Sequence, residues 1–315
     1  MNPLVFDSLA PVVLLIACGV LAGRCGWLGE SAIKDLTQLI FYLLSPALLF
    51  QTMSRVRIEQ LDFMPVTAYF VAAALLFAAI LCLKGFSRRS AVLALAGTFS
   101  NTVMIGIALI NLLFGPQGLV TLLTLVSIHA LVLLTLATLV LELAVRRDAM
   151  ADQTPGLPTA SMSSLLLQSL KSTVLHPVPL PILLGLIYAQ TGWSIPAVIA
   201  QPMTLLGAAL SPLALVLVGV SLAHARVGSH WRGALALSTV KNLLHPAMVW
   251  GLCWLWGVDG LAMTVMVVAA ALPIGANVFL FSQRYRVAQE LITASVAMSS
   301  LLALITLTAT LALLL

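Results

Sequence analysis

Pro273-Ile274-Gly275-Ala276-Asn277 interrupts an apolar run that otherwise extends from Leu261 to Gln283. A run of this length can cross a bilayer as one helix, which needs about 20 apolar residues. Within one turn, however, Pro273 removes a backbone donor, Gly275 loosens the chain, and the Asn277 side chain offers both donors and acceptors. An unsatisfied backbone group costs several kcal/mol in hydrocarbon, so a break here requires neighbouring protein or a water-filled cavity.

The composition of the whole chain places this break in a membrane protein. Of 315 residues, 61% are hydrophobic and 8% are charged, whereas about a quarter of the residues of a soluble domain are charged. The mean hydropathy is +1.12. Short polar breaks recur along the chain, so nearly all of it is expected in lipid, with no room for a soluble catalytic domain. The apolar run that follows Asp7 is expected to be the first helix rather than a signal peptide.

The apolar runs predict ten transmembrane helices. They are expected near Leu4–Gly23, Leu36–Met53, Phe63–Leu83, Ala91–Phe114, Leu119–Ala144, Val178–Gln190, Ile199–Ala223, Ala234–Trp256, Leu261–Gln283 and Leu291–Leu315. Residues 146–171 are rich in Pro, Gly, Ser and charge, which is typical of a hydrated linker. They are predicted to be a cytoplasmic linker and surface segment between a five-helix repeat at 1–145 and a second one at 172–315.

The basic residues predict the orientation. Twelve of the fifteen lie in the first, third, fifth, seventh and ninth connections: Arg24, Lys34, Lys84, Arg88, Arg89, Arg146, Arg147, Lys171, Arg226, Arg232, Arg284 and Arg286. The other side holds Arg55 and Arg57. By the positive-inside rule, the odd loops are cytoplasmic and both termini lie outside the cytoplasm. The net charge of +5 therefore serves orientation, and nucleic-acid binding is not expected.

Two pairs of segments indicate an internal repeat. Leu44-Ser45-Pro46-Ala47-Leu48-Leu49 in helix two matches Leu210-Ser211-Pro212-Leu213-Ala214-Leu215 in helix seven, and Gly97-Thr98-Phe99-Ser100-Asn101 in helix four corresponds in character to the break in helix nine. Each pair relates one helix to the fifth helix after it. Because each half holds an odd number of helices, the second copy is inverted, as in many secondary transporters.

The polar residues of helices four and nine are the first candidates for a binding site. In helix four they are Asn101, Thr102 and Gly106, and in helix nine Pro273, Gly275 and Asn277. If both helices are broken and cross, their positive half-helix ends point at one place near the midplane, which suits an anionic or strongly dipolar solute. The alternative is that these residues only kink the helices and let them pack closely.

Helices five and eight add three titratable candidates. Lys241 and His245 are four residues apart and hence on one face of helix eight, and Lys241 is the only lysine within a predicted span. It is either a counter-charge for a substrate carboxylate or a cation that extends to the cytoplasmic surface. His129 could contact solute, carry a proton, or bond across to a neighbouring helix.

Acidic residues are missing from mid-depth, where exchangers driven by a buried carboxylate need one. All ten Asp and Glu residues fall near span ends or in loops. Coupling through histidine, through backbone sodium sites, or no coupling at all remains open. The four cysteines lack metal-ligand spacing, and no catalytic motif is present, so no metal, cofactor or enzymatic activity is expected.

Four motifs together resemble the auxin efflux carrier family over essentially the full length. They are Ser45-Pro46-Ala47-Leu48-Leu49-Phe50, Ser100-Asn101-Thr102 followed by Gly106, Gly219-Val220-Ser221-Leu222-Ala223, and Ala271-Leu272-Pro273-Ile274-Gly275-Ala276-Asn277-Val278-Phe279. The resemblance implies two inverted five-helix repeats, a scaffold part, a transport part, and crossing broken helices four and nine at the substrate site. The chain departs from the family where Ile107-Ala108-Leu109 lacks a proline and where His176-Pro177 replaces Asn-Pro.

The function expected from these observations is secondary transport of a small organic anion by alternating access. The family includes bacterial malonate transporters, so malonate or a related carboxylate and a bacterial inner membrane are favoured. The alternatives are a sodium-coupled carrier of the bile-acid type, which shares the inverted plan, and a channel. Exposed Gly, Ala and Leu faces would permit a homodimer.

Overall fold

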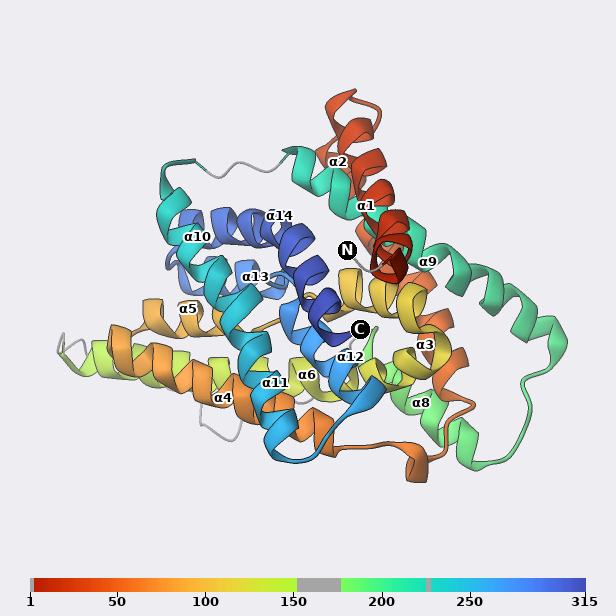
Figure 1. Cartoon of the computed structure of the whole chain (residues 1–315). Helices are drawn as coiled ribbons and strands as arrows, with labels where there is room; N and C mark the ends of the chain where they lie inside the picture. Colours follow the sequence, from red (N-terminus) through yellow and green to blue (C-terminus); the bar gives the residue numbers. More distant parts are fainter. Residues whose placement is uncertain (1–2, 152–176, 225–227) are drawn as a thin grey trace.

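The computed structural model describes residues 3–151, 177–224 and 228–315, and within them every regular element is a helix (Figure 1). Most of the predicted linker, together with Lys171, His176 and Arg226, lies outside the described residues. All ten predicted apolar segments are mainly helical. The chain is therefore an all-helical protein, and the differences from prediction concern how the segments are interrupted and joined.

The elements of the N-terminal half are α1 (Pro3–Arg24), α2 (Glu30–Leu39), η1 (Ile40–Leu44), α3 (Ser45–Met53), η2 (Ile58–Gln60), α4 (Met64–Lys84), α5 (Arg88–Thr98), η3 (Thr102–Gly106) and α6 (Ile107–Ala151). Those of the C-terminal half are α8 (Pro179–Gln190), α9 (Ala197–His224), η4 (Gly228–His230), α10 (Trp231–Thr239), η5 (Val240–Leu244), α11 (His245–Leu255), α12 (Gly260–Ala271), α13 (Asn277–Tyr285) and α14 (Gln289–Leu314).

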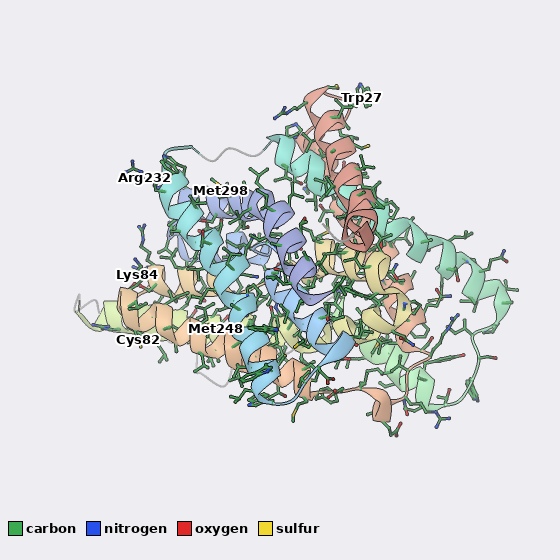
Figure 2. All side chains as sticks on the ribbon, viewed as in Figure 1. Trp27, Cys82, Lys84, Arg232, Met248 and Met298 are labelled. Atoms are coloured by element: carbon green, nitrogen blue, oxygen red, sulfur yellow. The ribbon has the colours of Figure 1, made fainter. Side chains whose placement is uncertain are left out.

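Five helices are long and apolar enough to cross a membrane: Ser31–Met53, Met64–Lys84, Thr102–Val145, Ala197–His224 and Gln289–Leu314. Three shorter apolar helices accompany them, at Ala10–Arg24, Pro179–Gln190 and Gly260–Ala271. Many large apolar side chains are exposed. Trp27, Lys84 and Arg232 lie near helix ends (Figure 2). This distribution is that of a multi-pass membrane protein.

Helix α6 contains two helices that meet at Gly115, in the gap expected between Phe114 and Leu119. The backbone of Gly115 is not helical, with φ at 59° and ψ at −154°, so helices four and five are separate, as predicted, and are joined by a kink. Glycine adopts this conformation without steric cost, and the following Pro116 lacks the donor that a straight helix would use there. At its C-terminal end, α6 continues to Ala151, past the predicted boundary at 145.

Two wide turns mark prolines inside long helices. The π-helical turns η1 and η5 directly precede Ser45-Pro46 and His245-Pro246. A proline ring clashes with the carbonyl four residues earlier and cannot donate a hydrogen bond. The wider turn relieves that clash, so α2 continues into α3, and α10 into α11, without a break.

The helices form two groups. The first helix group consists of α1, α2, α3, α8 and α9, and the second consists of α4, α5, α10, α11, α12, α13 and α14; α6 packs against both (Figure 1). In the first group, α1 and α9 approach at Gly19 and Gly219, where an added Cβ would collide with a carbonyl oxygen of the other helix. Such close contact is typical of small-residue packing in membranes.

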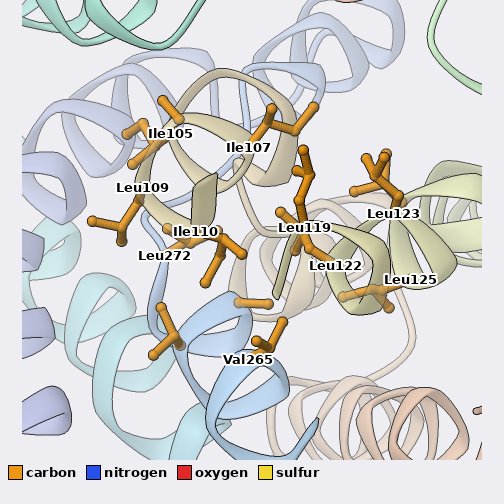
Figure 3. Close-up of a cluster of buried hydrophobic side chains, with 14 of the residues drawn as sticks. Ile105, Ile107, Leu109, Ile110, Leu119, Leu122, Leu123, Leu125, Val265 and Leu272 are labelled. Atoms are coloured by element: carbon orange, nitrogen blue, oxygen red, sulfur yellow. The ribbon is translucent and has the colours of Figure 1, made fainter. Parts of the chain in front are cut away.

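A buried apolar cluster joins the start of α6 to the end of α12 (Figure 3). Ile107, Leu109 and Ile110 are fully buried, as are Val265 and Leu272 opposite them. This cluster fixes the helix that follows the first interruption against the helix that precedes the second one. The positions of the two interruptions are therefore set by core packing.

Candidate functional site

Helices four and nine are both interrupted, and the interruptions contact each other. The first break, Phe99–Asn101, separates α5 from η3, and the second break, 272–276, separates α12 from α13. Ser100 and Ile274 form an antiparallel bridge. The Asn101 N–H donates to the Pro273 carbonyl at 2.9 Å, and the Gly275 N–H donates to the Phe99 carbonyl at 3.0 Å. Each break thus satisfies backbone groups of the other, as the membrane interior requires.

Glycine is needed at the closest point of this crossing. A Cβ at Gly275 would lie 2.6 Å from Phe99 Cδ1 and 3.1 Å from the Ser100 carbonyl oxygen. Gly106 has a packing role, because a Cβ there would lie 2.8 Å from Leu272 Cδ1. The first break forms although the segment after Asn101 has no proline.

A cavity of about 790 Å³ lies between the two helix groups, next to the crossing. Its size is within the usual range for small-molecule sites, about 300–1,000 Å³. Of the nine predicted site residues, five line it: Asn101, Thr102, His129, Gly275 and Asn277. The other four, Gly106, Lys241, His245 and Pro273, lie outside its lining.

Further polar groups line the cavity that sequence reasoning missed: Thr37 and Gln38 from α2, Ser221 and His224 from α9, and Thr293 and Ser300 from α14. In α9 and α14 the spacing of these residues was a usable signal, since residues three or seven apart share one helix face. Within the part of the chain that the structure describes, no Lys, Arg, Asp or Glu lines the cavity. Neutral donors and helix ends therefore set its electrostatics.

The second break presents a helix end to the cavity. Helix α13 begins at Asn277 without a side-chain cap, and Ala276, Asn277 and Leu280 all line the cavity. In the first break, by contrast, Asn101 Oδ1 accepts a hydrogen bond from the Met104 N–H at 3.3 Å. The N-terminal end of a helix carries a partial positive charge, so an anion is favoured beside α13.

A buried hydrogen-bond network supports the first break from behind. The Tyr69 hydroxyl lies 2.8 Å from Ser100 Oγ and 3.1 Å from His129 Nε2. The His129 ring also stacks near Phe99, with centroids 4.6 Å apart. His129 thus both bonds across to α4 and lines the cavity. Tyr69 was not predicted, because a single tyrosine in an apolar run gives no sequence signal.

Lys241 lies behind the second break. It is fully buried, and its Nζ donates to the Ala270 carbonyl at 2.5 Å and to the Leu272 carbonyl at 2.7 Å. It reaches neither the cavity nor the surface of the protein. His245 is buried one turn further along; its ring centroid is 5.1 Å from that of Tyr69, and neither ring nitrogen has a hydrogen-bond partner among the described residues.

One side-chain contact ties the end of α13 to α6. The Tyr285 hydroxyl donates to Glu142 Oε1 at 3.0 Å. Burial, and then the hydrogen bond and negative charge of Glu142, raise the pKa of Tyr285 to about 12. The phenol therefore stays protonated and keeps donating throughout the physiological pH range.

Comparison with known proteins assigns the family. A family model described as membrane transport protein matches residues 4–311. The chain belongs to this family, the auxin efflux carrier family that its sequence resembles. The carrier is also 27% identical over 305 residues to a Rhizobium meliloti protein named "Putative malonate transporter". The aligned region covers 95% of this chain and 92% of the relative. Family membership identifies a membrane transporter and not an enzyme.

Proposed function

We propose that this carrier moves a small organic anion, malonate or a related carboxylate being favoured, across a bacterial inner membrane by alternating access. The observation that carries the proposal is the cavity beside the crossing of the two broken helices, with the uncapped start of α13 in its wall. The name of the Rhizobium meliloti relative supports malonate as the first candidate.

The lining chemistry suits a carboxylate held by neutral donors. The side-chain amides of Asn101 and Asn277 and the hydroxyl of Thr102 offer hydrogen-bond donors at the crossing. His129 of α6 and His224 of α9 also line the cavity and can donate from their rings. Because a substrate must also leave, a site without a fixed cation binds the anion while avoiding a contact too strong to release. Lys241, His245, Gly106 and Pro273 then act on the breaks and not on the substrate.

The position of the cavity supports an inward-facing state. Its wall includes the start of α2, the end of α9 and the start of α14, which all lead to loops predicted to be cytoplasmic. Toward the opposite side, the gap between α1 and α14 is only about 30 Å³. Pro273 of the second break is one of the residues that line this gap. In the proposed cycle, the second helix group moves against the first and exposes the crossing to each side in turn.

This cycle assumes the predicted topology. Ten spans in two inverted repeats, residues 1–145 and 172–315, joined by 146–171, would place both termini outside the cytoplasm. Contacts between predicted same-side loops support it: Arg147 Nη1 donates to the Phe86 carbonyl at 3.1 Å, and His230 Nε2 lies 2.8 Å from Glu290 Oε2.

Ligand-dependent stabilisation tests the proposed substrate. The detergent-purified protein is heated with a panel of mono- and dicarboxylates, and the unfolding midpoint is measured for wild type, Asn277→Ala and Asn111→Ala, a matched change outside the cavity lining. A ligand at 100 times its Kd stabilises a protein by about 2.7 kcal/mol. We expect a dicarboxylate to raise the midpoint in wild type and Asn111→Ala and to do so much less in Asn277→Ala.

Four outcomes would redirect the proposal. No response to any carboxylate in folded protein would contradict an anion carrier, and an equal response in Asn277→Ala would move the site away from the second break. Stabilisation that requires sodium and disappears in potassium would favour the sodium-coupled alternative. In liposomes, uptake must saturate with substrate concentration; single-channel currents would instead indicate a channel.

A further inference from the structure

Helix α12 ends inside the protein with carbonyl groups that have no helical partner. The last carbonyls of any helix lack intrahelical donors, and the end carries a partial negative charge. Here the chain leaves the helix at Leu272, where φ is −59° and ψ is 151°, so no further turn supplies the missing N–H groups. In a membrane interior, these carbonyls need another donor.

Lys241 is the donor that the structure supplies. Its Nζ bonds both the Ala270 and the Leu272 carbonyl, which flank the end of α12. The side chain comes from the π-helical turn η5 and is fully buried. Among the described residues, no carboxylate lies within ion-pair distance of it. The partial negative charge at the end of α12 therefore takes the place of a carboxylate partner for this ammonium.

The helix end favours the charged form of this side chain. An unpaired ammonium is costly to bury, and a neutral side chain with two donors would avoid this cost. A cation against a helix C-terminus gains from the negative end of the helix dipole, in addition to two charge-assisted hydrogen bonds. The charge of the lysine is therefore matched to the end of α12.

We infer that Lys241 is a positioning residue whose ammonium is the built-in counter-cation of the second helix break. It occupies the place at the α12 carbonyls where a cation from solution would otherwise bind. The lysine thereby fixes the direction in which the chain enters Gly275 and Asn277 and keeps the start of α13 aimed at the cavity. No solution cation is needed to hold this break. The inference stands apart from the identity of the substrate.

Hydrogen–deuterium exchange in the absence of substrate tests the inference. Peptides covering the second break and the first break are followed in wild type, Lys241→Met, Lys241→Gln and the surface control Lys34→Gln. Met keeps an unbranched side chain, one atom shorter, without donors, and Gln keeps donors without charge. We expect exchange at the second break to be roughly tenfold faster in both Lys241 variants, with smaller changes elsewhere and none in Lys34→Gln.

The outcomes separate charge from other roles. Normal exchange in Lys241→Gln would show that neutral donors suffice and would overturn the counter-cation role; this comparison stands even if Lys241→Met fails to fold. Faster exchange spread evenly over the chain would reduce Lys241 to a packing residue. In wild type, exchange at the second break should be the same in sodium and in N-methylglucamine chloride, and protection that depends on sodium would contradict the inference.

Discussion

Both helix breaks leave backbone groups without helical partners inside the protein, but different side chains support them. The first break is short, Phe99 to Asn101, and the helix resumes under a side-chain cap from Asn101. The second break runs from 272 to 276, contains a proline, and resumes without a cap. Neutral groups, Tyr69 and His129, support the first break, whereas a buried cation supports the second.

This difference gives the two breaks different roles. The first break carries its own local cap, so its geometry depends mainly on hydrogen bonds nearby. The second break leaves its helix start open toward the cavity and relies on Lys241 and on Ser299, whose Oγ accepts from the Ile274 N–H at 3.1 Å. An open start stabilised from behind is free to bind a ligand. A repeat in sequence character therefore does not imply equal roles at the site.

The largest expected effect comes from the point where the breaks touch. Gly275→Ala places a methyl group 2.6 Å from the Phe99 ring and should separate both segments, which we expect to destabilise the protein by about 3 kcal/mol and to abolish ligand stabilisation. Unfolding by SDS in mixed micelles measures the change. Gly251→Ala is the control, because a Cβ there meets no atom within 4 Å and should be neutral or slightly stabilising. Equal behaviour of the two variants would argue against close contact at the crossing.

An intermediate effect is expected from the neutral support of the first break. Tyr69→Phe leaves Ser100 Oγ and His129 Nε2 without their shared partner, which we expect to cost about 2 kcal/mol. The same unfolding assay applies, with Tyr188→Phe as a control whose hydroxyl has no hydrogen bond among the described residues. Exchange should quicken at the first break and not at the second. Faster exchange at the second break alone would reverse the comparison.

The smallest effect distinguishes the two asparagines. Asn101→Ala removes the cap on η3 and should lower stability without ligand by about 1 kcal/mol. Asn277→Ala removes no cap and should leave that stability unchanged while weakening ligand binding. Unfolding midpoints with and without dicarboxylate measure both quantities. If Asn277→Ala is the more destabilised of the two, the second break is held by its own side chain and not from behind.

Much of the helical plan follows from local residue types. Ser100, Asn101, Pro273, Gly275 and Asn277 stand out because their types conflict with uninterrupted helix in an apolar run, and both predicted breaks are present and crossed. The boundary between helices four and five also follows from the sequence, because the non-helical Gly115 and the adjacent Pro116 lie in the gap predicted there. The π turns were not predicted, since a proline can also end or bend a helix.

The sequence by itself determined that this is a helical membrane protein with two weak points in its apolar runs, because lipid leaves so few ways to satisfy a backbone. Only the tertiary structure decided what meets at those points. Helical spacing puts Lys241 and His245 on one face but does not say which helix that face contacts. The structure directs Lys241 to the carbonyl end of α12 and gives the cavity to Asn101, His129 and Asn277. Packing decides which residues distant in sequence become partners, and no local sequence pattern contains that information.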